Sequence, residues 1–233
     1  MQRKKKKLVK FLEMDELNKL QQPLTEKAEL ALEVGRENMT KTNAIALRDF
    51  AVLSLLYGCA LRVSEGVNLK LHNLLLDKTQ VYIINSKGDD RFVDIPLPVV
   101  DILKEWLKIR PNIKGNDYVF TRVKGSTKSG EFAESKPLPL RRQYYNKLIE
   151  NLAKKTGVTL KGDLEEKLPS PHTLRHSRAM ALRDEDTELD LLKEILGHKD
   201  LKTTQVYAHA RREQIRNAQM NNTKGIISLK GIK

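Results

Sequence analysis

The order of apolar and polar residues predicts a chain that is mainly helical. Residues 42–58 carry apolar side chains on most faces of a helix and end at Gly58, which predicts a buried central helix. A short helix, weakened by Gly66, is predicted over 63–71. Apolar residues at helical spacing predict further helices over 10–24, 24–39, 99–110, 140–157, 171–183, 189–197 and 203–220.

A change of period interrupts the helical pattern after the central helix. Short runs rich in β-branched and aromatic residues, at 74–76, 80–85 and 91–95, predict a three-stranded antiparallel sheet. Residues 117–120 are a candidate for one more short strand, and the polar, Gly- and Ser-rich stretch 121–137 predicts a loop. The expected fold class is therefore mainly α with a small antiparallel β-sheet (α+β).

The composition shows that the chain carries a net positive charge. The 233 residues suggest one or two domains, and 43 Lys and Arg against 30 Asp and Glu leave a net charge of +13. Such an excess favours a polyanionic partner, either nucleic acid or an anionic membrane surface, although a solvated basic surface is the simpler interpretation. The single cysteine, Cys59, cannot form an internal disulfide, which favours a reducing compartment. No apolar run approaches the roughly 20 residues that span a bilayer, and the basic N-terminus does not continue as a secretory signal.

Two clusters with chemical potential lie in the first half of the chain. The stretch "ALRVSE" places Arg62 just after the central helix, with Glu65 three residues later. The stretch "INSKGDDRF" places Lys87 at the tip of the predicted hairpin. Each has an ordinary structural interpretation, because Arg62 could simply pair with Glu65, and most hairpin lysines are only turn residues.

Two further clusters lie in the second half. The stretch "HTLRH" places His172 and Arg175 on one face of one predicted helix. In "LGHKDLKTTQVYAH", His198 follows a helix-ending Gly197, and Tyr207 lies in the next predicted helix. A lone histidine after such a glycine is usually a cap, and a lone helical tyrosine is usually a packing residue.

The combination and order of these clusters are more specific than any one of them. The segments "LLYGCALRVSE", "HTLRHS" and "LGHKDLKTTQVYAH" resemble the signature boxes of the tyrosine recombinase (phage integrase) family. The resemblance extends from Phe11 to the residues after Tyr207. It implies the tyrosine recombinase catalytic-domain fold and an enzyme that cleaves and rejoins DNA through a covalent 3′-phosphotyrosine intermediate. It implies no cofactor and no metal.

The resemblance also implies a role for each candidate residue at the scissile phosphate. Arg62 and Arg175 would clamp the non-bridging oxygens with charge-assisted hydrogen bonds, and His198 would add another donor. Tyr207 would be the nucleophile.

Three further residues would assist this reaction. A phenol with a pKa near 10 needs a base at neutral pH, for which His172 is the best candidate. Lys87 would protonate the leaving 5′ oxygen, and Glu65 would support Arg62.

The chain also departs from the family pattern. Gly66 and Arg178 stand where the family usually has apolar residues, and His176 is expected to have a structural rather than a catalytic role. A DNA-clamping domain usually precedes the catalytic domain, and too few residues precede the boxes here to form one. A catalytic-domain fragment is favoured over a minimal recombinase. The expected organisation is a basic arm or linker remnant (1–10), a catalytic domain (11–220) and a C-terminal tail (221–233) that either frays or docks on a neighbouring protomer.

The function expected from these observations is that of a site-specific DNA recombinase or integrase, as mobile genetic elements often encode, although the sequence does not tell a host protein from one of a mobile element. A type IB-like topoisomerase and a catalytically silent DNA-binding module are the alternatives. The expected partners are double-stranded DNA and further copies of the chain assembled on DNA, from a protein that is monomeric in solution. No membrane association is expected, and the expected location is the cytoplasm, on DNA. The sequence does not identify the target site, accessory DNA-bending factors, or the direction of recombination.

Overall fold

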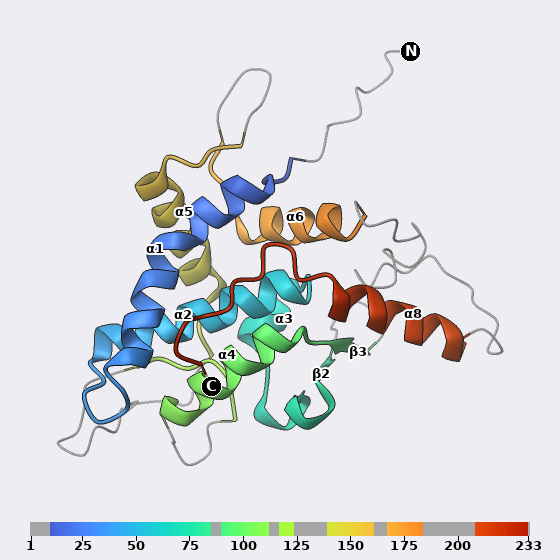
Figure 1. Cartoon of the computed structure of the whole chain (residues 1–233), viewed down its shortest axis with the longest axis horizontal. Coiled ribbons are helices and arrows are strands. Elements are labelled where there is room, and N and C mark those ends of the chain that lie inside the picture. The colour runs from blue at the N-terminus through green and yellow to red at the C-terminus, as the bar shows by residue number, and fades with distance from the viewer. Residues whose placement is uncertain are drawn as a thin grey trace.

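The structure is a computed structural model of the whole chain (Figure 1). It describes residues 10–84, 90–111, 117–123, 139–160, 167–183 and 208–232, and for 208–213 the backbone only. No helix in these ranges has both the length and the apolar character needed to cross a membrane.

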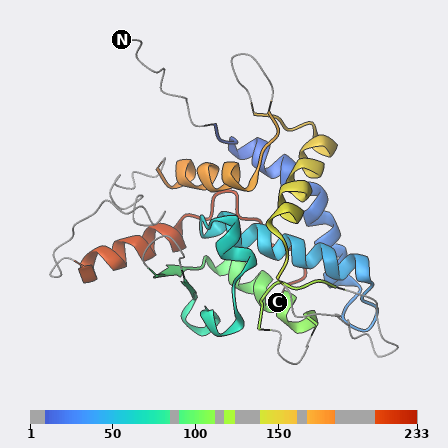
Figure 2. The same cartoon turned by 180° about the vertical axis from the view of Figure 1, so that it is seen from behind.

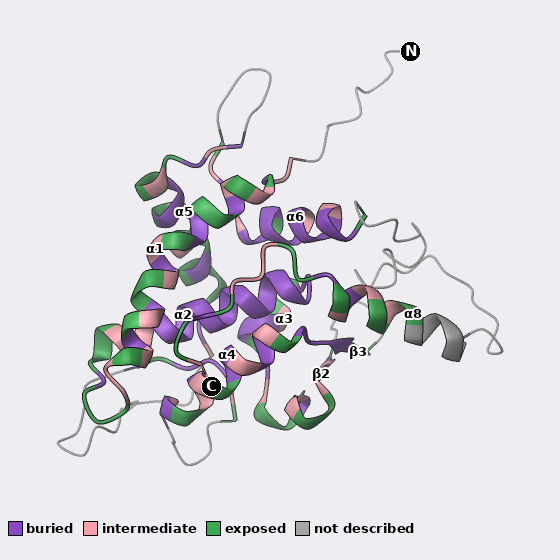
Figure 3. Ribbon diagram, viewed as in Figure 1, coloured by how far each residue is buried: buried purple, intermediate pink, exposed green. Residues whose placement is uncertain are grey.

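The predicted central helix is confirmed as α2, Lys41–Gly58. Thr40 begins it, because its hydroxyl accepts a hydrogen bond from the Asn43 amide at 3.2 Å. Every residue from Ala46 to Gly58 is buried, as the purple helix in Figure 3 shows. In Figure 1, α2 runs between α6 above and α4 below, with α1 and α5 at one end and the sheet and α8 at the other. The same arrangement is visible from behind in Figure 2.

The first helix corrects the prediction of two helices over 10–24 and 24–39. A single helix, α1, runs from Met14 to Glu33 with Pro23 inside it. Proline removes one helical hydrogen bond and costs about 3 kcal/mol in a helix interior. A continuous buried stripe, apolar except for Gln21, packs α1 against α2 and α5 across the proline, and this burial outweighs that cost. The stripe consists of Leu17, Leu20, Gln21, Leu24, Ala28 and Ala31.

The predicted three-stranded antiparallel sheet is confirmed, with strand order β1-β2-β3. Val81 pairs with Val93 and Ile83 pairs with Arg91, so the sheet's inner face is continuous across β2 and β3. The strands and the short 3-10 turns beside them are η1 Leu71–Asn73, β1 Leu74–Leu75, η2 Leu76–Lys78, β2 Gln80–Ile83 and β3 Arg91–Asp94.

Two details of this region differ from the prediction. Helix α3 covers only Val63–Val67, because the chain leaves the helix at Asn68 and Lys70 forms a β-bridge with Tyr118. The prediction of a helix over 63–71 is therefore wrong in its second half. The candidate strand at 117–120 contributes only that isolated bridge.

The remaining predicted helices that lie in the described ranges are present. Gly157 ends α5 with a φ of 66°, a left-handed conformation that glycine adopts without strain. The predicted helix over 189–197 lies outside the described residues, as do residues 203–207 of the next one. The helices are α4 Leu97–Ile109, α5 Arg142–Thr156, α6 Pro171–Arg183 and α8 Ala208–Asn221.

The C-terminal tail is folded onto the core of its own chain. After α8 it crosses α2 and follows α1 (Figure 1), where the Gln21 amide donates to the Gly225 carbonyl at 3.3 Å. Farther along, the Lys230 amide donates to the Glu29 carboxylate at 3.1 Å, and Leu229 is buried. Docking of the tail on a neighbouring protomer stays a prediction.

Candidate active site

The turn after α2 leads the chain to the candidate site. The amide of Ala60 donates to the Tyr57 carbonyl at 2.9 Å, and the amide of Leu61 donates to the Leu56 carbonyl at 3.0 Å. This pattern is a Schellman motif, and it places Ala60 at a φ of 49°. A left-handed conformation is unfavourable for a residue with a Cβ. The turn ends at Arg62, which stands at the N-terminus of α3.

Glu65 organises the positive charge around this turn. Its carboxylate accepts hydrogen bonds from the Arg62 backbone amide at 2.8 Å and from the Arg62 guanidinium at 2.9 Å. Arg91, on β3, donates to both carboxylate oxygens at 3.1 Å. The Glu65 side chain is 5% exposed, whereas that of Arg62 is 42% exposed. Arg62 is therefore held by Glu65 while its side chain stays partly exposed to solvent.

Helix α6 supplies the opposite wall. Pro171 is its first residue, and Ser170 precedes it with a hydroxyl 3.4 Å from the Thr173 amide. One turn further on, Arg175 donates to the Ala60 carbonyl and lies 4.0 Å from Glu65. The strained Ala60 turn therefore holds both ends of the site, because it leads to Arg62 and accepts a hydrogen bond from Arg175.

The electrostatics of the cluster favour an anion. Arg62, Arg91 and Arg175 carry three positive charges against the single negative charge of Glu65. Burial alone would raise the pKa of Glu65, but hydrogen bonds and charge from Arg91, with help from Arg62, hold that pKa below its ordinary value. Burial and the positive charges of Arg62 and Arg91 lower the pKa of Arg175 to about 10, against the opposing charge of Glu65. Glu65 and Arg175 are therefore both charged at neutral pH.

Three of the predicted site residues, Arg62, His172 and Arg175, line one cavity of about 390 Å³. The N-terminal part of α5 closes another side of it with Arg142 and Asn146. The rest of the wall is formed by Leu61, Val63, Ser64, Ser170 and Pro171. A cavity bordered by several guanidinium groups suits an anion with several oxygens, such as a phosphodiester.

His172 has a close neighbour on its own helix. Its Nε2 lies 2.9 Å from the Nε2 of His176, and the two rings meet edge to face with centroids 4.2 Å apart. In such a pair one nitrogen donates and the other accepts, which orients both rings. His176 thus contacts His172 directly, and its structural rather than catalytic role stays a prediction.

The remaining predicted catalytic residues are not among those that the structure describes. Lys87, His198 and Tyr207 lie outside the described residues. The catalytic roles of all six candidates, and the supporting role of Glu65, stay predictions. Among the described residues, no group of three or more His, Cys, Asp or Glu side chains is placed to hold a metal ion.

Sequence reasoning missed Arg91, although the strand pattern contained a signal for it. Residues 91, 93 and 95 alternate onto the inner face of the sheet, and Val93 and Ile95 are buried there. An arginine at the first of these positions requires a buried acidic partner, which is Glu65. Arg142 and Asn146 gave no comparable signal, since their place beside the cavity depends on how α5 packs.

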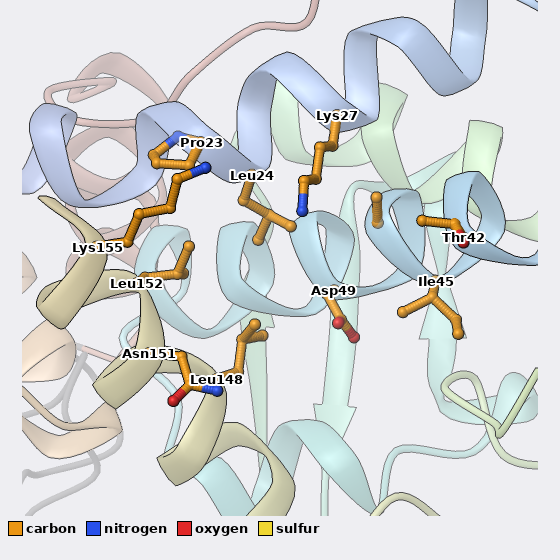
Figure 4. Close-up of a pocket in the computed structure, with 11 residues that line it drawn as sticks. Pro23, Leu24, Lys27, Thr42, Ile45, Asp49, Leu148, Asn151, Leu152 and Lys155 are labelled. Carbon is orange, nitrogen blue, oxygen red and sulfur yellow. The ribbon is translucent and has the colours of Figure 1, made fainter.

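A second cavity, of about 240 Å³, lies between α1, α2 and α5 (Figure 4). Its walls are mostly aliphatic, Lys27 and Lys155 reach along them, and Asp49 lies at one side. The Asp49 carboxylate is already bonded, because Tyr144 donates to it at 2.6 Å and Arg48 at 2.7 Å. None of the four described residues of the predicted site lines this cavity.

Comparison with known proteins gives a consistent result. Residues 12–214 match the sequence profile of the phage integrase family. The tyrosine recombinase XerD of Listeria innocua is 33% identical over 170 residues, which cover 71% of this chain and 51% of that protein. This chain spans about half the length of the first curated relatives that it matches.

Two crystal structures share the fold. The XerA recombinase is 24% identical with a TM-score of 0.58, over 91% of this chain and 65% of that one. The XerH site-specific recombinase bound to its difH substrate is 22% identical with a TM-score of 0.59, over 89% of this chain and 52% of that one. The expected fold class is thereby confirmed.

Proposed function

The chain belongs to the phage integrase family, and from this premise we propose that it is a site-specific DNA recombinase. Its chemistry would cleave and rejoin DNA strands through a covalent 3′-phosphotyrosine intermediate. The observation that carries the proposal is the cavity lined by Arg62, His172 and Arg175, with Glu65 and Arg91 fixing the arginines behind it. We place the catalytic domain at 11–220.

In the proposed reaction the cavity holds the scissile phosphate. Arg62 offers exposed guanidinium donors, and Arg175 adds a largely buried charge from the opposite wall. As the phosphate passes to a five-coordinate transition state, negative charge grows on its non-bridging oxygens. Preorganised cations stabilise that charge more than they stabilise the ground state, so the arginines accelerate the reaction. His198 would add a further donor.

In the proposed reaction each bond that breaks is matched by one that forms, and each proton has a donor and an acceptor. No external energy source is needed. The Tyr207 oxygen attacks phosphorus and its proton passes to His172, while the bond from phosphorus to the 5′ oxygen breaks. Lys87 gives a proton to the leaving 5′ oxygen, which becomes a hydroxyl. Attack by a 5′-hydroxyl on the phosphotyrosine bond reverses these steps and joins a new strand. The phosphodiester bond energy is conserved in the intermediate.

The proposed partner is double-stranded DNA, and the proposed assembly is a homo-oligomer formed on it from monomers. The net charge of +13 and the exposed side chain of Arg62 support binding to the DNA backbone. XerH, which shares the fold, is bound to its difH substrate in its crystal structure. Binding dominated by phosphate contacts should weaken steeply as salt rises.

A strand-transfer assay tests the proposal. A labelled, nicked duplex carrying a cognate site is incubated with the protein and with a second duplex that offers a free 5′-hydroxyl. The proposed function predicts a labelled strand joined to the second duplex, and Tyr207→Phe removes it. Relaxation of supercoiled plasmid by dilute protein, without transfer between duplexes, would instead indicate a topoisomerase. Binding with neither product would indicate a silent DNA-binding module.

A further inference from the structure

Arg178 is fully buried on α6, one turn beyond Arg175. Its guanidinium donates to the carbonyl of Gly58 at 3.3 Å, to the carbonyl of Asn222 at 2.6 Å and to the Asn222 side-chain oxygen at 2.8 Å. Longer contacts of 3.5 Å reach the carbonyls of Gln219 and Lys224. One side chain therefore touches the ends of two other helices.

The chemistry of these partners explains why a charge is stable in the core. Gly58 is the last residue of α2, and Gln219 and Asn222 stand at the end of α8. The last carbonyls of a helix lack helical donors, and they carry the negative end of the helix dipole. Two such ends converge on one guanidinium, whose planar fork of donors can serve several acceptors at once. Arg178 thus caps both helices.

Neighbouring hydrogen bonds stabilise the same contact between α2, α6 and α8. The Asn222 side-chain amide donates to the Ala181 carbonyl of α6 at 2.9 Å. The Tyr57 hydroxyl, on α2, donates to the Lys224 carbonyl at 2.9 Å. On the far side of α8, the side-chain oxygen of Gln219 accepts from the Asp94 amide of β3 at 3.3 Å. The end of α8 is therefore fixed to α2, α6 and the sheet.

Two of the three helices joined by Arg178 lead to or carry residues that line the proposed cavity, and the third follows the proposed nucleophile in the chain. The end of α2 leads through the Ala60 turn to Arg62, and α6 carries His172 and Arg175. Helix α8 begins at Ala208, the residue that follows Tyr207 in the chain.

We propose that Arg178 is a positioning residue for strand cleavage, which sets α8 in register with the phosphate-binding ends of α2 and α6. The inference rests on the proposed function. It adds a residue that touches neither the cavity nor the phosphate, since Arg178 is absent from the cavity wall. A misplacement of about 1 Å at reacting groups slows a reaction about 10²-fold.

The test compares two variants with a matched control on nicked suicide DNA carrying a cognate site. Arg178→Lys keeps the charge between the helix ends but loses the fork of donors. Asn222→Ala removes the side-chain clasp of α8 and leaves the Gly58 contact in place. Arg36→Lys makes the same chemical change at an exposed turn residue. For each protein, the rate of covalent adduct formation at saturating DNA, the DNA dissociation constant and the thermal unfolding midpoint are measured.

A positioning role predicts a split between rate and affinity. Arg178→Lys should slow adduct formation by about tenfold to 10²-fold, with the dissociation constant unchanged, because the guanidinium groups that meet phosphate are intact. Asn222→Ala should slow it less, and Arg36→Lys should match the wild type.

The proposal is overturned if both variants form the adduct at the wild-type rate, or if rate and affinity fall together by the same factor. If Arg178→Lys does not fold, Asn222→Ala is judged by the same criteria. Absence of any adduct with the wild-type protein would overturn the proposed function itself, and the inference with it. An unchanged rate in the variants beside an active wild type overturns only the role of Arg178.

Discussion

Replacing Arg91 with methionine tests how the arginine cluster is held together. The change removes a guanidinium that donates to both oxygens of Glu65, each at 3.1 Å, and leaves an unbranched apolar side chain in its place. Glu65 keeps two hydrogen bonds, both from Arg62. The carboxylate of Glu65 therefore loses two of its hydrogen bonds but keeps a partner.

The size of the effect follows from these contacts. Hydrogen bonds to charged groups contribute about 1.5–3 kcal/mol each, so two lost bonds give a gross loss of about 3–6 kcal/mol. The Nε of Arg91 is buried without a hydrogen-bond partner among the described residues, and its removal recovers about 1–3 kcal/mol. The centres of these two ranges differ by about 2.5 kcal/mol, which is the expected net loss in the free energy of unfolding. Glu65 should also move closer to Arg175, which withdraws positive charge from the cavity and slows adduct formation.

Urea unfolding followed by circular dichroism measures this loss. With a denaturant slope of about 2–3 kcal/mol/M, the midpoint should fall by about 1 M. The matched control is Arg216→Met, because Arg216 also pairs with a buried carboxylate, that of Asp94, at 3.1 Å. Its side chain is 44% exposed, so this change should cost less than about 1 kcal/mol. Equal, small shifts for both variants would refute the idea that Arg91 fixes Glu65.

Three further predictions concern the tail, the leaving group and pH. Gly157→Ala and Gly225→Ala both place a Cβ at a φ near 66–69°. An added Cβ meets nothing within 4 Å at Gly157, but at Gly225 it lies 2.5 Å from Leu17, so Gly225→Ala should lower the free energy of unfolding by about 1–3 kcal/mol more. Equal losses in chemical denaturation would show that the tail does not pack as described. Lys87→Ala should slow cleavage by roughly 10²–10⁴-fold, and a substrate with sulfur at the bridging 5′ position should largely restore it. Equal slowing on both substrates would assign Lys87 to phosphate binding. Because the folded pKa of Glu65 is below its ordinary value of 4.5, its stabilising contribution is complete above that value and is lost as pH falls through the folded pKa. The stability difference between wild type and Glu65→Gln should therefore shrink in acid, and a constant difference between pH 7 and pH 3 would contradict the ion pairing.

The pattern of apolar and polar residues was sufficient to predict the central helix and the sheet. The apolar residues on most faces of α2 and the alternation of β2 and β3 identify a buried helix and a half-buried sheet. Helix α1 shows the limit of such reasoning. Whether a proline ends a helix or lies within it depends on the tertiary packing of the stripe around Pro23, which no short window of sequence contains.

In the candidate site, too, some residues could be predicted from the sequence and others depend on tertiary packing. Motif order indicated Arg62, Glu65, His172 and Arg175, and the structure brings these four into one cluster. The partners behind them are long-range contacts: Arg91 reaches Glu65 across 26 residues of sequence.

Arg178 shows why a departure from a family pattern is informative only with its surroundings. As a sequence feature it was an arginine at a usually apolar position. Its meaning depends on the carbonyls of Gly58 and Asn222, which lie 120 and 44 residues away in the chain.

The central claim is that Tyr207 attacks DNA, and peptide mapping of the covalent adduct tests it most directly. The protein is incubated with nicked suicide DNA carrying a cognate site, the adduct is digested, and mass spectrometry locates the nucleotide-bearing residue. The proposed mechanism predicts a 3′-phosphate linked to Tyr207, with no adduct from Tyr207→Phe and nearly unchanged DNA binding by that variant. A linkage to any other of the six tyrosines in the chain, or an adduct that persists in Tyr207→Phe, would contradict it.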